Sequence, residues 1–394
     1  MRILYFSYVE LDMPNACRTH TLGIIKGFAR QRCRVDAMIP KPIKEVTRIP
    51  NVRFIFLRPW QFSHIGSFWA RLMSGAVMVW LCLTNKYDFI YIRELEINPG
   101  PRWCARLFKL PFFIEINDLL VLTYSDKGVN KWLVNMVSRN QKKDFHLATG
   151  LIVPSVPMSN WIIKRYNLNP RKVHFIPNGA DSPNKEPLKK IDAREQLKMP
   201  LNCFCVGFVG NIYDRYDFET LLKAIVICRS KAREIFLLIV GDGPLKRPLQ
   251  KKVEKYGLGS SSVFTGFVDP ELLGNYVPAM DVGVIILDKE IARRYGPLNT
   301  KSSTYGIFKI PVIVSSLSLV GYQKKIMNSL FFTKPESPEA LADMIIQLHD
   351  DPYEKKRKAN MFHSLVKSKM TWDVCAIQIL HIVHKEISSK SLIL

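Results

Sequence analysis

The chain has 394 residues, of which 47% are hydrophobic and 23% charged, so its composition is that of a globular protein and not of a disordered one. This length favours two domains. The 57 Lys and Arg residues outnumber the 34 Asp and Glu residues and give a net charge of +23, which favours an anionic partner: a phosphorylated ligand, an anionic membrane or nucleic acid. The sequence has no convincing basic run with interleaved aromatic residues, and this argues against nucleic acid.

The first half of the chain alternates short apolar runs with helical patterns. A helix is predicted at 21–30, and strands are predicted at 2–8, 34–39, 52–57, 89–92, 112–116, 150–153 and 173–176. A strand, a polar loop, a helix and a second strand in this order are typical of a doubly wound parallel sheet. The apolar run 72–83 is too short to span a membrane, which takes about 20 residues.

The run 72–83 has two interpretations. It is either a buried helix of the first domain or a helix that lies on a membrane surface. The second interpretation depends on the aromatic and basic residues in and around it, Trp60, Phe68, Trp69, Arg71 and Trp80.

A polar, proline-rich segment at 182–187 is typical of a linker, and the alternation starts again after it. Strands are predicted at 205–209, 235–240, 263–265, 282–287, 311–314 and 331–332, and helices at 218–230, 245–256, 270–279 and 338–349. We therefore predict one domain at 1–184, a second at 185–371, and a C-terminal helix within 372–394 that packs back across the domains through an apolar stripe.

The cysteines predict the redox state of the protein. The eight cysteines are scattered, without a CxxC pair or the spacing of metal ligands, so we expect reduced thiols and a cytoplasmic location. The start, MRILYFSYV, reads as a strand and lacks the layout of a signal peptide.

Several motifs in the second half follow one another in an order that few families share. These are VGFVGN, LLIVGDGP, VFTGFVDPELLGNYVPAMDVGVI, a lysine four residues before a tyrosine, and IPVIVS. In this order they resemble the C-terminal half of the retaining, nucleotide-sugar glycosyltransferases of the GT-B fold called family four. In the first half FIPNGAD, YDFIYIRELE and FFIEINDL are similar to the same family, so the resemblance covers nearly the whole chain. It implies an α/β protein with two Rossmann-like, doubly wound parallel-sheet domains that face a cleft.

Glycines mark the predicted donor site. Gly207 and Gly210 flank the end of a strand, where a missing side chain lets backbone amides reach a phosphate at a helix N-terminus, although a tight turn alone also explains them. In the family a basic residue often follows this glycine directly; here that position is Asn211, and the resemblance gives the role to Arg215. It also implies that Gly241 and Gly243 line the nucleotide side of the cleft, and that the next loop, with Phe267 and Val268, touches the base.

Lys301 is the strongest single candidate for catalysis. Its ammonium group would stabilise the leaving diphosphate where negative charge develops, although a plain surface lysine is the alternative. The family pattern is Lys-x-x-Glu-Tyr-x-x-x-Gly-x-Pro. Lys301, Tyr305 and Pro311 match it, but Thr304 replaces the glutamate that clasps the ribose, Lys309 replaces the glycine, and Gly296 stands where many members have an earlier acid. Thr304 can still form a hydrogen bond to the ribose, and Glu290 is a nearby substitute. We assign Thr304 and Tyr305, together with Asn211, to the donor site.

Polar residues of the first domain follow its predicted strands and therefore gather at the ligand-binding edge of a parallel sheet. Asn15, Arg18 and His20 follow the first strand, and we assign them, with Arg93, to the acceptor; capping of the next helix is the alternative for Arg18 and His20. Because family members place a histidine or an acid against the donor sugar, Asn117 and Asp118 join Arg215 and Lys301 as candidate catalytic residues.

The resemblance predicts a glycosyltransferase that moves a sugar from a nucleotide-diphosphate sugar to a lipid-linked or polysaccharide acceptor in cell-surface glycan synthesis, of the exopolysaccharide, O-antigen or capsule type. The sequence has no Asp-x-Asp metal signature next to a strand, so we expect retaining transfer without a metal and without a cofactor other than the donor. We expect a cytoplasmic enzyme, peripheral on the inner face of the membrane. The alternative is a catalytically silent relative that binds a glycan or a partner protein. A nicotinamide-dependent dehydrogenase is disfavoured by the missing GxGxxG after the first strand.

Overall fold

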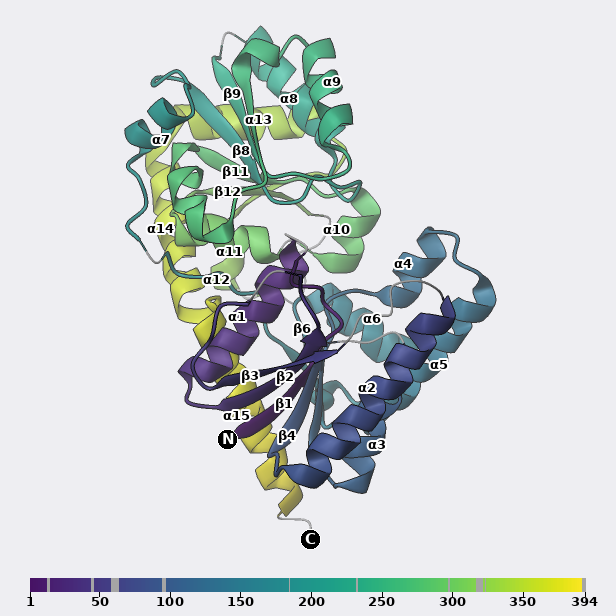
Figure 1. Cartoon of the computed structure of the whole chain (residues 1–394). Helices are drawn as coiled ribbons and strands as arrows, with labels where there is room; N and C mark the ends of the chain where they lie inside the picture. Colours follow the sequence, from purple (N-terminus) through teal and green to yellow (C-terminus); the bar gives the residue numbers. More distant parts are fainter. Residues whose placement is uncertain are drawn as a thin grey trace. The chain divides into compact units, whose positions relative to one another are not determined.

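The computed structural model describes residues 1–12, 15–43, 46–57, 64–93, 97–183, 185–231, 233–296, 298–316, 322 and 324–391, without the side chains of 64–72 and 389–391. The chain forms two compact units (Figure 1). Unit 1 comprises Met1–Met13, Cys17–Pro177 and Trp372–Leu394, and unit 2 comprises Pro14–Ala16 and Asn178–Thr371. The main chain therefore passes from unit 1 to unit 2 after Pro177, somewhat before the predicted boundary at 184/185, and returns after Thr371.

Unit 1 is built on a parallel sheet of seven strands in the order β3-β2-β1-β4-β5-β6-β7. The strands are β1 (Arg2–Phe6), β2 (Arg34–Pro40), β3 (Val52–Leu57), β4 (Phe89–Arg93), β5 (Phe112–Glu115), β6 (Gly150–Val153) and β7 (Val173–Phe175). The strands β1, β4, β5 and β6 are apolar and buried along nearly their whole length, as in a sheet covered on both faces. The doubly wound sheet predicted from the sequence is confirmed.

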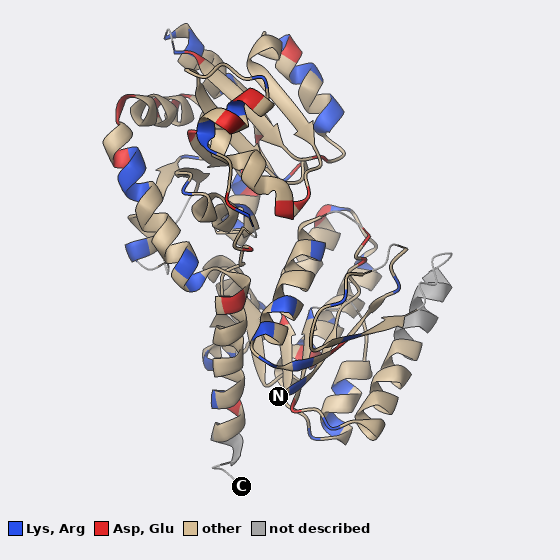
Figure 2. Cartoon of the chain, turned by 60° about the vertical axis from the view of Figure 1, so that its left-hand side comes forward, with Lys and Arg blue, Asp and Glu red and all other residues tan. Residues whose placement is uncertain are grey.

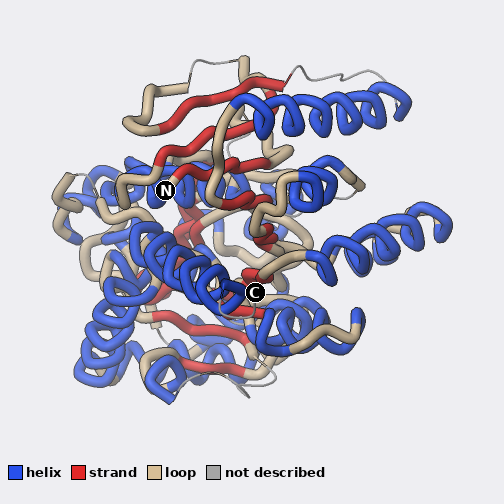
Figure 3. The backbone as a smooth tube through the Cα atoms, turned by 90° about the horizontal axis from the view of Figure 1, so that it is seen from below, coloured by secondary structure: helices blue, strands red, loops and turns tan. Residues whose placement is uncertain are grey.

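Helices cover both faces of this sheet (Figure 3). They are α1 (Ala16–Arg30), α2 (His64–Thr84), α3 (Gly100–Leu107), α4 (Leu120–Asp126), α5 (Lys131–Leu147), α6 (Val156–Tyr166) and α15 (Trp372–Ser391), with a 3-10 turn at Pro170–Lys172. The chain changes direction between β1 and β4. Right-handed connections therefore place α1 on one face of the sheet and α2, α3 and α5 on the other.

The C-terminal helix α15 completes the core of unit 1. Its Trp372, Ile379 and Val383 are buried in the same cluster as residues of α1 and β1. Two glycines of α1 make room for it: a Cβ on Gly23 would lie 2.5 Å from the Trp372 ring, and a Cβ on Gly27 would lie 2.7 Å from the Trp372 carbonyl oxygen. Helix α15 is therefore an integral part of unit 1.

Helix α2 contains the apolar run of the sequence. Met78 and Leu81 are buried, as expected for a core helix, while Trp80 and Leu83 are exposed. None of the helices in the described ranges is long and apolar enough to cross a membrane. Trp60 and the side chains of Phe68, Trp69 and Arg71, which entered the membrane interpretation, lie outside the described residues.

Unit 2 is built on a parallel sheet of six strands in the order β10-β9-β8-β11-β12-β13. The strands are β8 (Phe204–Val209), β9 (Ile235–Val240), β10 (Ser262–Gly266), β11 (Val282–Ile285), β12 (Val312–Ser315) and β13 (Phe331–Thr333). The helices are α7 (Lys190–Gln196), α8 (Phe218–Ser230), α9 (Lys246–Lys255), α10 (Lys289–Tyr295), α11 (Thr300–Ile307), α12 (Lys324–Met327), α13 (Pro338–Asp350) and α14 (Pro352–Lys369). One cluster of buried side chains from β8, β9, β11, α8 and α13 forms the core.

The prediction of an α-helix at 270–279 is wrong. The segment forms two 3-10 helices, Pro270–Asn275 and Val277–Ala279, with a break at Tyr276. Pro278 has no amide hydrogen to donate in an α-helix, and its ring disfavours the helical conformation of the residue before it. A continuous α-helix therefore cannot form across this segment.

Candidate active site

Two glycine turns contact each other at the carboxyl edge of the unit 2 sheet. Gly210 follows β8 with φ 122° and Gly241 follows β9 with φ 151°. A Cβ on Gly241 would lie 2.0 Å from the carbonyl oxygen of Gly210, so only glycine fits there. The Gly210 amide donates to the Val240 carbonyl at 2.8 Å, and the Ile212 amide donates to the Asp242 carbonyl at 2.9 Å. The turns thus form one unit at the edge where parallel sheets bind ligands.

The turn after β9 is also tied to the loop after β10. A Cβ on Gly243 would lie 2.5 Å from the Ile212 carbonyl oxygen. The side chain of Asp242 accepts from the Gly243 amide at 2.8 Å and from Lys246 Nζ at 3.0 Å. The hydrogen bond from Lys246, together with the amides of Gly243 and Phe267, lowers the pKa of Asp242. The predicted donor residues Gly241, Gly243 and Phe267 therefore lie together, with Val268 next in the chain, and the ring of Phe267 is exposed.

Lys301 lies in the first turn of α11. Asn299 caps this helix by accepting from the amides of Lys301 and Ser302 at 3.0 and 3.2 Å. The ammonium group of Lys301 lies against Gly210, because a Cβ on Gly210 would be 2.8 Å from Lys301 Nζ. Among the residues that the structure describes, no carboxylate forms an ion pair with Lys301. A cation at the positive end of a helix, without a protein counter-ion, favours an anionic ligand.

Aromatic side chains fix the position of this ammonium group. Lys301 Nζ donates to the Tyr216 hydroxyl at 2.6 Å and lies 4.4 Å from the centre of the Tyr216 ring and 5.4 Å from that of Phe208. Tyr216 packs edge-on against Phe208, with ring centres 5.0 Å apart. Both contacts are favourable for a cation. Sequence reasoning missed Tyr216 and Phe208, because nothing local links Tyr216 to a lysine 85 positions later.

Arg215 lies on the same loop as Tyr216. Its guanidinium is 5.2 Å from the centre of the Tyr295 ring in α10, and its carbonyl accepts from the Asp288 amide at 3.1 Å. Tyr216 pairs with Leu287, so this loop runs along the end of β11. The two predicted cations are therefore joined through Tyr216, which follows Arg215 in the chain and binds Lys301.

The residues that differ from the family pattern, or could substitute for its missing groups, have defined contacts in the structure. Thr304 lies one turn after Lys301, and its hydroxyl donates to the Thr300 carbonyl at 3.0 Å, which leaves the oxygen as an acceptor. Glu290 is exposed and pairs with Arg293 of its own helix at 3.0 Å. Asn211 is partly buried beside Gly210.

Tyr305 has a different role from the predicted donor contact. It is fully buried; its hydroxyl accepts from the Val209 amide at 2.9 Å and donates to the Gly207 carbonyl at 3.1 Å. Burial raises the pKa of Tyr305 well above its usual value. Tyr305 thus holds the end of β8 in place and supports the glycine turn from within the core. Tyr305 contacts the site through hydrogen bonds to backbone groups.

At the carboxyl edge of the unit 1 sheet, His20 and Glu115 form a buried pair. His20 Nε2 lies 3.0 Å from Glu115 Oε1, and each residue is 4% exposed. The His20 ring packs edge-on against Trp372 at 4.8 Å. Burial alone would raise the pKa of Glu115, but the attraction and hydrogen bond of His20, with a smaller effect of Arg93, lower it below the usual value. His20, predicted to bind the acceptor, is therefore a core residue of unit 1.

The other predicted residues of unit 1 lie around this pair. Arg93 donates to the Cys17 carbonyl at 3.3 Å and joins the end of β4 to the first turn of α1, which also carries the partly buried Arg18. Asp118 accepts from the Leu119 amide at 2.8 Å and from the Thr123 hydroxyl at 2.9 Å at the start of α4.

Asn117 and Asn15 complete the predicted set. The Asn117 side-chain nitrogen is buried without a hydrogen-bond partner among the described residues. Asn15 is partly buried and groups with unit 2. Arg18, Arg93, Asn117 and Asp118 thus follow β1, β4 and β5 at one edge of the unit 1 sheet.

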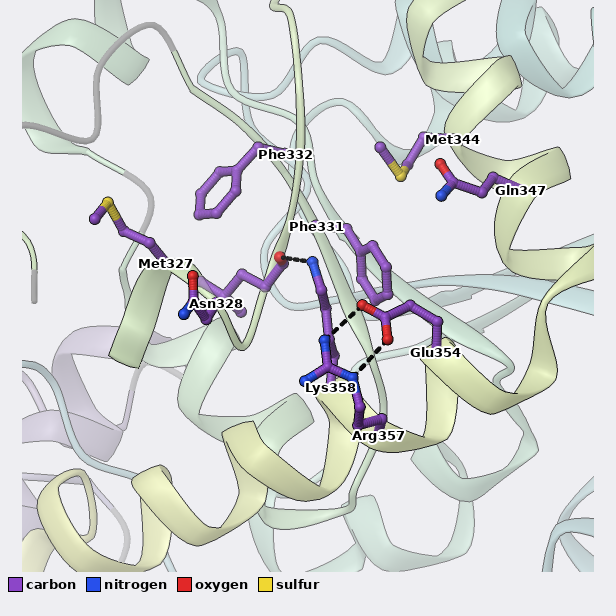
Figure 4. Close-up of a pocket in the computed structure, with 10 residues that line it drawn as sticks. Met327, Asn328, Phe331, Phe332, Met344, Gln347, Glu354, Arg357 and Lys358 are labelled. Atoms are coloured by element: carbon purple, nitrogen blue, oxygen red, sulfur yellow. Dashed lines mark hydrogen bonds and ion pairs between the residues drawn. The ribbon is translucent and has the colours of Figure 1, made fainter. Parts of the chain in front are cut away.

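A separate cavity of about 370 Å³ is lined by residues of β13, α13 and α14 (Figure 4). Phe331, Met344 and Lys358 are among its lining residues. Its charged groups already have partners, since Arg357 pairs with Glu354 at 2.6 Å and Lys358 Nζ donates to the Leu330 carbonyl at 3.0 Å. The lining residues that the structure describes do not include any residue of the glycine turns.

Comparisons with known proteins agree with this geometry. Residues 204–351, which contain both glycine turns and Lys301, match the family described as glycosyl transferases group 1. An uncharacterized glycosyltransferase of Methanocaldococcus jannaschii is 22% identical over 368 residues, 90% of either chain. The alpha-monoglucosyldiacylglycerol synthase of Streptococcus pneumoniae is 21% identical over 74% of this chain and 62% of its own length. The match identifies residues 204–351 as a group 1 glycosyltransferase domain.

Solved structures show that the glycosyltransferase has the GT-B fold. The sucrose-phosphate synthase of Thermosynechococcus elongatus superposes with a TM-score of 0.75 at 19% identity, covering 98% of this chain and 99% of its own. HepE of Anabaena in complex with UDP-glucose superposes with a TM-score of 0.72 at 15% identity, covering 99% and 100%. The predictions of fold, family and enzyme class are confirmed.

Proposed function

We propose that this glycosyltransferase moves a sugar from a nucleotide-diphosphate sugar to a lipid-linked or polysaccharide acceptor in cell-surface glycan synthesis, with retention of configuration and without a metal. Lys301 carries the proposal. Its ammonium group lies beside the Gly210 turn and at the positive end of α11, where a diphosphate meets a cation, a helix terminus and backbone amides together.

In the proposed reaction the bond between the sugar C1 and the diphosphate oxygen breaks, and a bond between C1 and the acceptor oxygen forms on the same face. The proton of the attacking hydroxyl passes to the departing diphosphate oxygen. Lys301 and Arg215 stabilise the charge that develops on the diphosphate, so charge stabilisation and not a dedicated base supplies most of the acceleration. Asn117 and Asp118 are the candidates to position the sugar.

The relatives support the substrate classes. HepE was solved with UDP-glucose, and the name of the Streptococcus pneumoniae relative gives it a glucosylated diacylglycerol as product. Together with the net charge of +23, this supports a lipid-linked acceptor presented at an anionic membrane, with the enzyme cytoplasmic and peripheral on the inner face.

A donor panel tests the proposal. Purified protein is incubated with UDP-, GDP- and ADP-sugars, and we expect binding and slow hydrolysis of one of them. Lys301→Ala should lower turnover at least about 100-fold, while Lys251→Ala, on exposed α9, should leave turnover unchanged. No binding and no hydrolysis across the panel would contradict the enzymatic proposal, and unchanged turnover in Lys301→Ala would remove Lys301 from the mechanism.

A catalytically silent relative is the second candidate, and the position of Thr304 favours it. Thr304 replaces the ribose-clasping glutamate, its hydroxyl proton is used within α11, and Glu290 is engaged by Arg293. Nucleotide binding without hydrolysis or transfer to any acceptor would support this candidate.

A further inference from the structure

We propose that the outer side of α2 and α3 docks on the surface of an anionic lipid bilayer. The inference rests on the membrane association proposed above and names the part of the molecule that makes it. Three kinds of observation carry it: large exposed apolar side chains, the geometry of two adjacent helices, and the charge around them.

Helix α2 exposes large apolar side chains on the side that faces away from the sheet. Met73, Trp80 and Leu83 are 55%, 60% and 70% exposed, while Met78 and Leu81 on the opposite side are almost completely buried. Positions 73, 76, 80 and 83 recur at helical spacing, so they form a stripe. A surface helix of a soluble protein carries polar residues on this side. From residue 73 to its end, α2 has no charged residue at all (Figure 2).

Helix α3 extends this stripe. It exposes Trp103 by 43% and Leu107 by 68%. The two helices touch at Gly75 and Gly100, where a Cβ on Gly100 would lie 2.4 Å from the Gly75 Cα. Both helices return from the carboxyl edge of a parallel sheet, so they run in the same direction.

The exposed side chains of α2 and α3 lie at similar heights along the two helix axes. At a rise of about 1.5 Å per residue, Leu83 lies about 12 Å beyond the Gly75 contact and Leu107 lies about 10 Å beyond the Gly100 contact. Trp80 and Trp103 lie nearer to the contact on their respective helices. We call the five residues Met73, Trp80, Leu83, Trp103 and Leu107 the α2–α3 patch.

Positive charges predominate around the patch, although the exposed Asp88 lies close to Lys86 after α2. Helices α2, α3 and α5 contain one acidic residue, Asp144, and Arg102 of α3 neutralises it at 2.5 Å. This ion pair also places α5 beside α3. The exposed cations on and directly after these helices are Lys86, Arg106, Lys109, Lys131, Arg139, Lys142 and Lys143. A patch of Trp and Leu with a cationic border matches the interface of an anionic bilayer, where indole rings sit at the headgroup level and lysines pair with lipid phosphates.

The same charge argues against a second copy of this chain as the occupant. A symmetric dimer through the patch would bring two cationic borders together, and like charges across an interface oppose association. An acidic protein remains chemically compatible, and the experiment distinguishes it from lipid.

The full-length protein is sedimented with vesicles of phosphatidylcholine, with or without phosphatidylglycerol, at low salt. We expect it to pellet with the anionic vesicles only. Trp80→Ser combined with Trp103→Ser should lower the partition coefficient at least about tenfold. The matched control is Ile191→Ser combined with Leu272→Ser in unit 2, whose side chains are 58% and 50% exposed, and it should pellet like the wild type.

A charge-reversal pair tests the cationic border. Lys142→Glu with Lys143→Glu should release the protein from anionic vesicles, whereas Lys251→Glu with Lys255→Glu, on α9 of unit 2, changes the net charge equally and should not. Donor binding by every variant shows that it is folded.

Three outcomes would overturn the inference. One is equal pelleting of the Trp80 and Trp103 variant and its control, which rejects the patch and leaves membrane association standing. Another is a wild type that never pellets, which rejects membrane association as well but not sugar transfer, since the donor panel measures that separately. The third is Trp-dependent self-association in light scattering, or Trp-dependent binding of polyglutamate without vesicle binding, which gives the patch to a protein.

Discussion

The carboxyl edges of the two sheets differ in what they are made of. In unit 2 the edge consists of backbone: the turns at Gly210 and Gly241 lie against each other, and the main side chain added to them is Lys301. In unit 1 the edge consists of side chains, and its centre, His20 with Glu115, is buried in the core beside Trp372. A backbone edge with a cation favours a phosphate ligand, whereas a buried, hydrogen-bonded pair of side chains contributes to the stability of its own unit. Substitutions in unit 2 should therefore affect ligand binding, and substitutions at the unit 1 pair should affect folding.

The largest effect should come from breaking the unit 1 pair. Glu115→Leu leaves His20 buried without its acid and should cost about 3 to 5 kcal/mol of unfolding free energy at pH 7. The double variant His20→Phe, Glu115→Leu should recover part of this loss, because an apolar pair needs no charge partner. Denaturant unfolding of the three proteins measures both effects. A Glu115→Leu protein as stable as the wild type would contradict the comparison.

The same pair predicts the pH dependence of stability. The pKa of Glu115 in the folded protein lies below that in the unfolded chain, about 4.3. Its stabilisation is therefore complete above that pH and is lost as the pH falls through the folded-state pKa. Glu115→Leu should remove this loss of stability at acidic pH. If the difference in unfolding free energy between the wild type and the variant is the same at pH 5 and at pH 3, the prediction is wrong.

In unit 2, Gly241→Ala should weaken binding of the nucleotide, such as UDP, by about 100-fold or more, equivalent to about 2.7 kcal/mol. The added Cβ would meet the Gly210 carbonyl oxygen and push the two turns apart. Gly257→Ala is the matched control, because Gly257 also has a positive φ, 68°, but has nothing within 4 Å of the added Cβ. Titration calorimetry measures binding, and equal losses in both variants would show that backbone strain alone is responsible.

The smallest effect should come from Tyr216→Phe. This change removes the hydroxyl that accepts from Lys301 Nζ but keeps the ring beside the ammonium group. We expect kcat to fall about tenfold, about 1.4 kcal/mol, with little change in the KM of the donor, because Tyr216 acts through Lys301. Tyr213→Phe, an exposed tyrosine of the same loop, should leave kcat unchanged. An equal effect of the two substitutions would reject Tyr216 as a positioning residue.

Apolar periodicity was sufficient to predict most of the fold. The helix at 218–230 and the strand at 235–240 agree with the structure to the residue, because both are runs with one clear apolar period between polar ends. The segment 270–279 was mispredicted because its apolar spacing is helical while Pro278 prevents the α-helical hydrogen bonds. In this segment the apolar spacing indicates a helix, while the proline backbone excludes the α-helical form.

The site was predictable only where it consists of backbone. The glycine turns could be identified from the sequence because only glycine tolerates those positions, and Lys301 stands in a recognisable pattern. The contact of Tyr216 with Lys301 and the burial of Tyr305 and His20 depend on residues far apart in the sequence. No single-sequence pattern contains that information, so the tertiary partners of a predicted site residue decide its role.

The position of α15 also determines the order in which the protein can fold during synthesis. Unit 2 is complete, apart from Pro14–Ala16, once Thr371 has left the ribosome, whereas the core of unit 1 lacks Trp372 and the rest of α15 until that helix has been made. Until then the groove that Gly23 and Gly27 leave on α1 is open and apolar. The first half of unit 1 is therefore made before unit 2 but completes its core after it, and deletion of α15 should damage unit 1 more than unit 2.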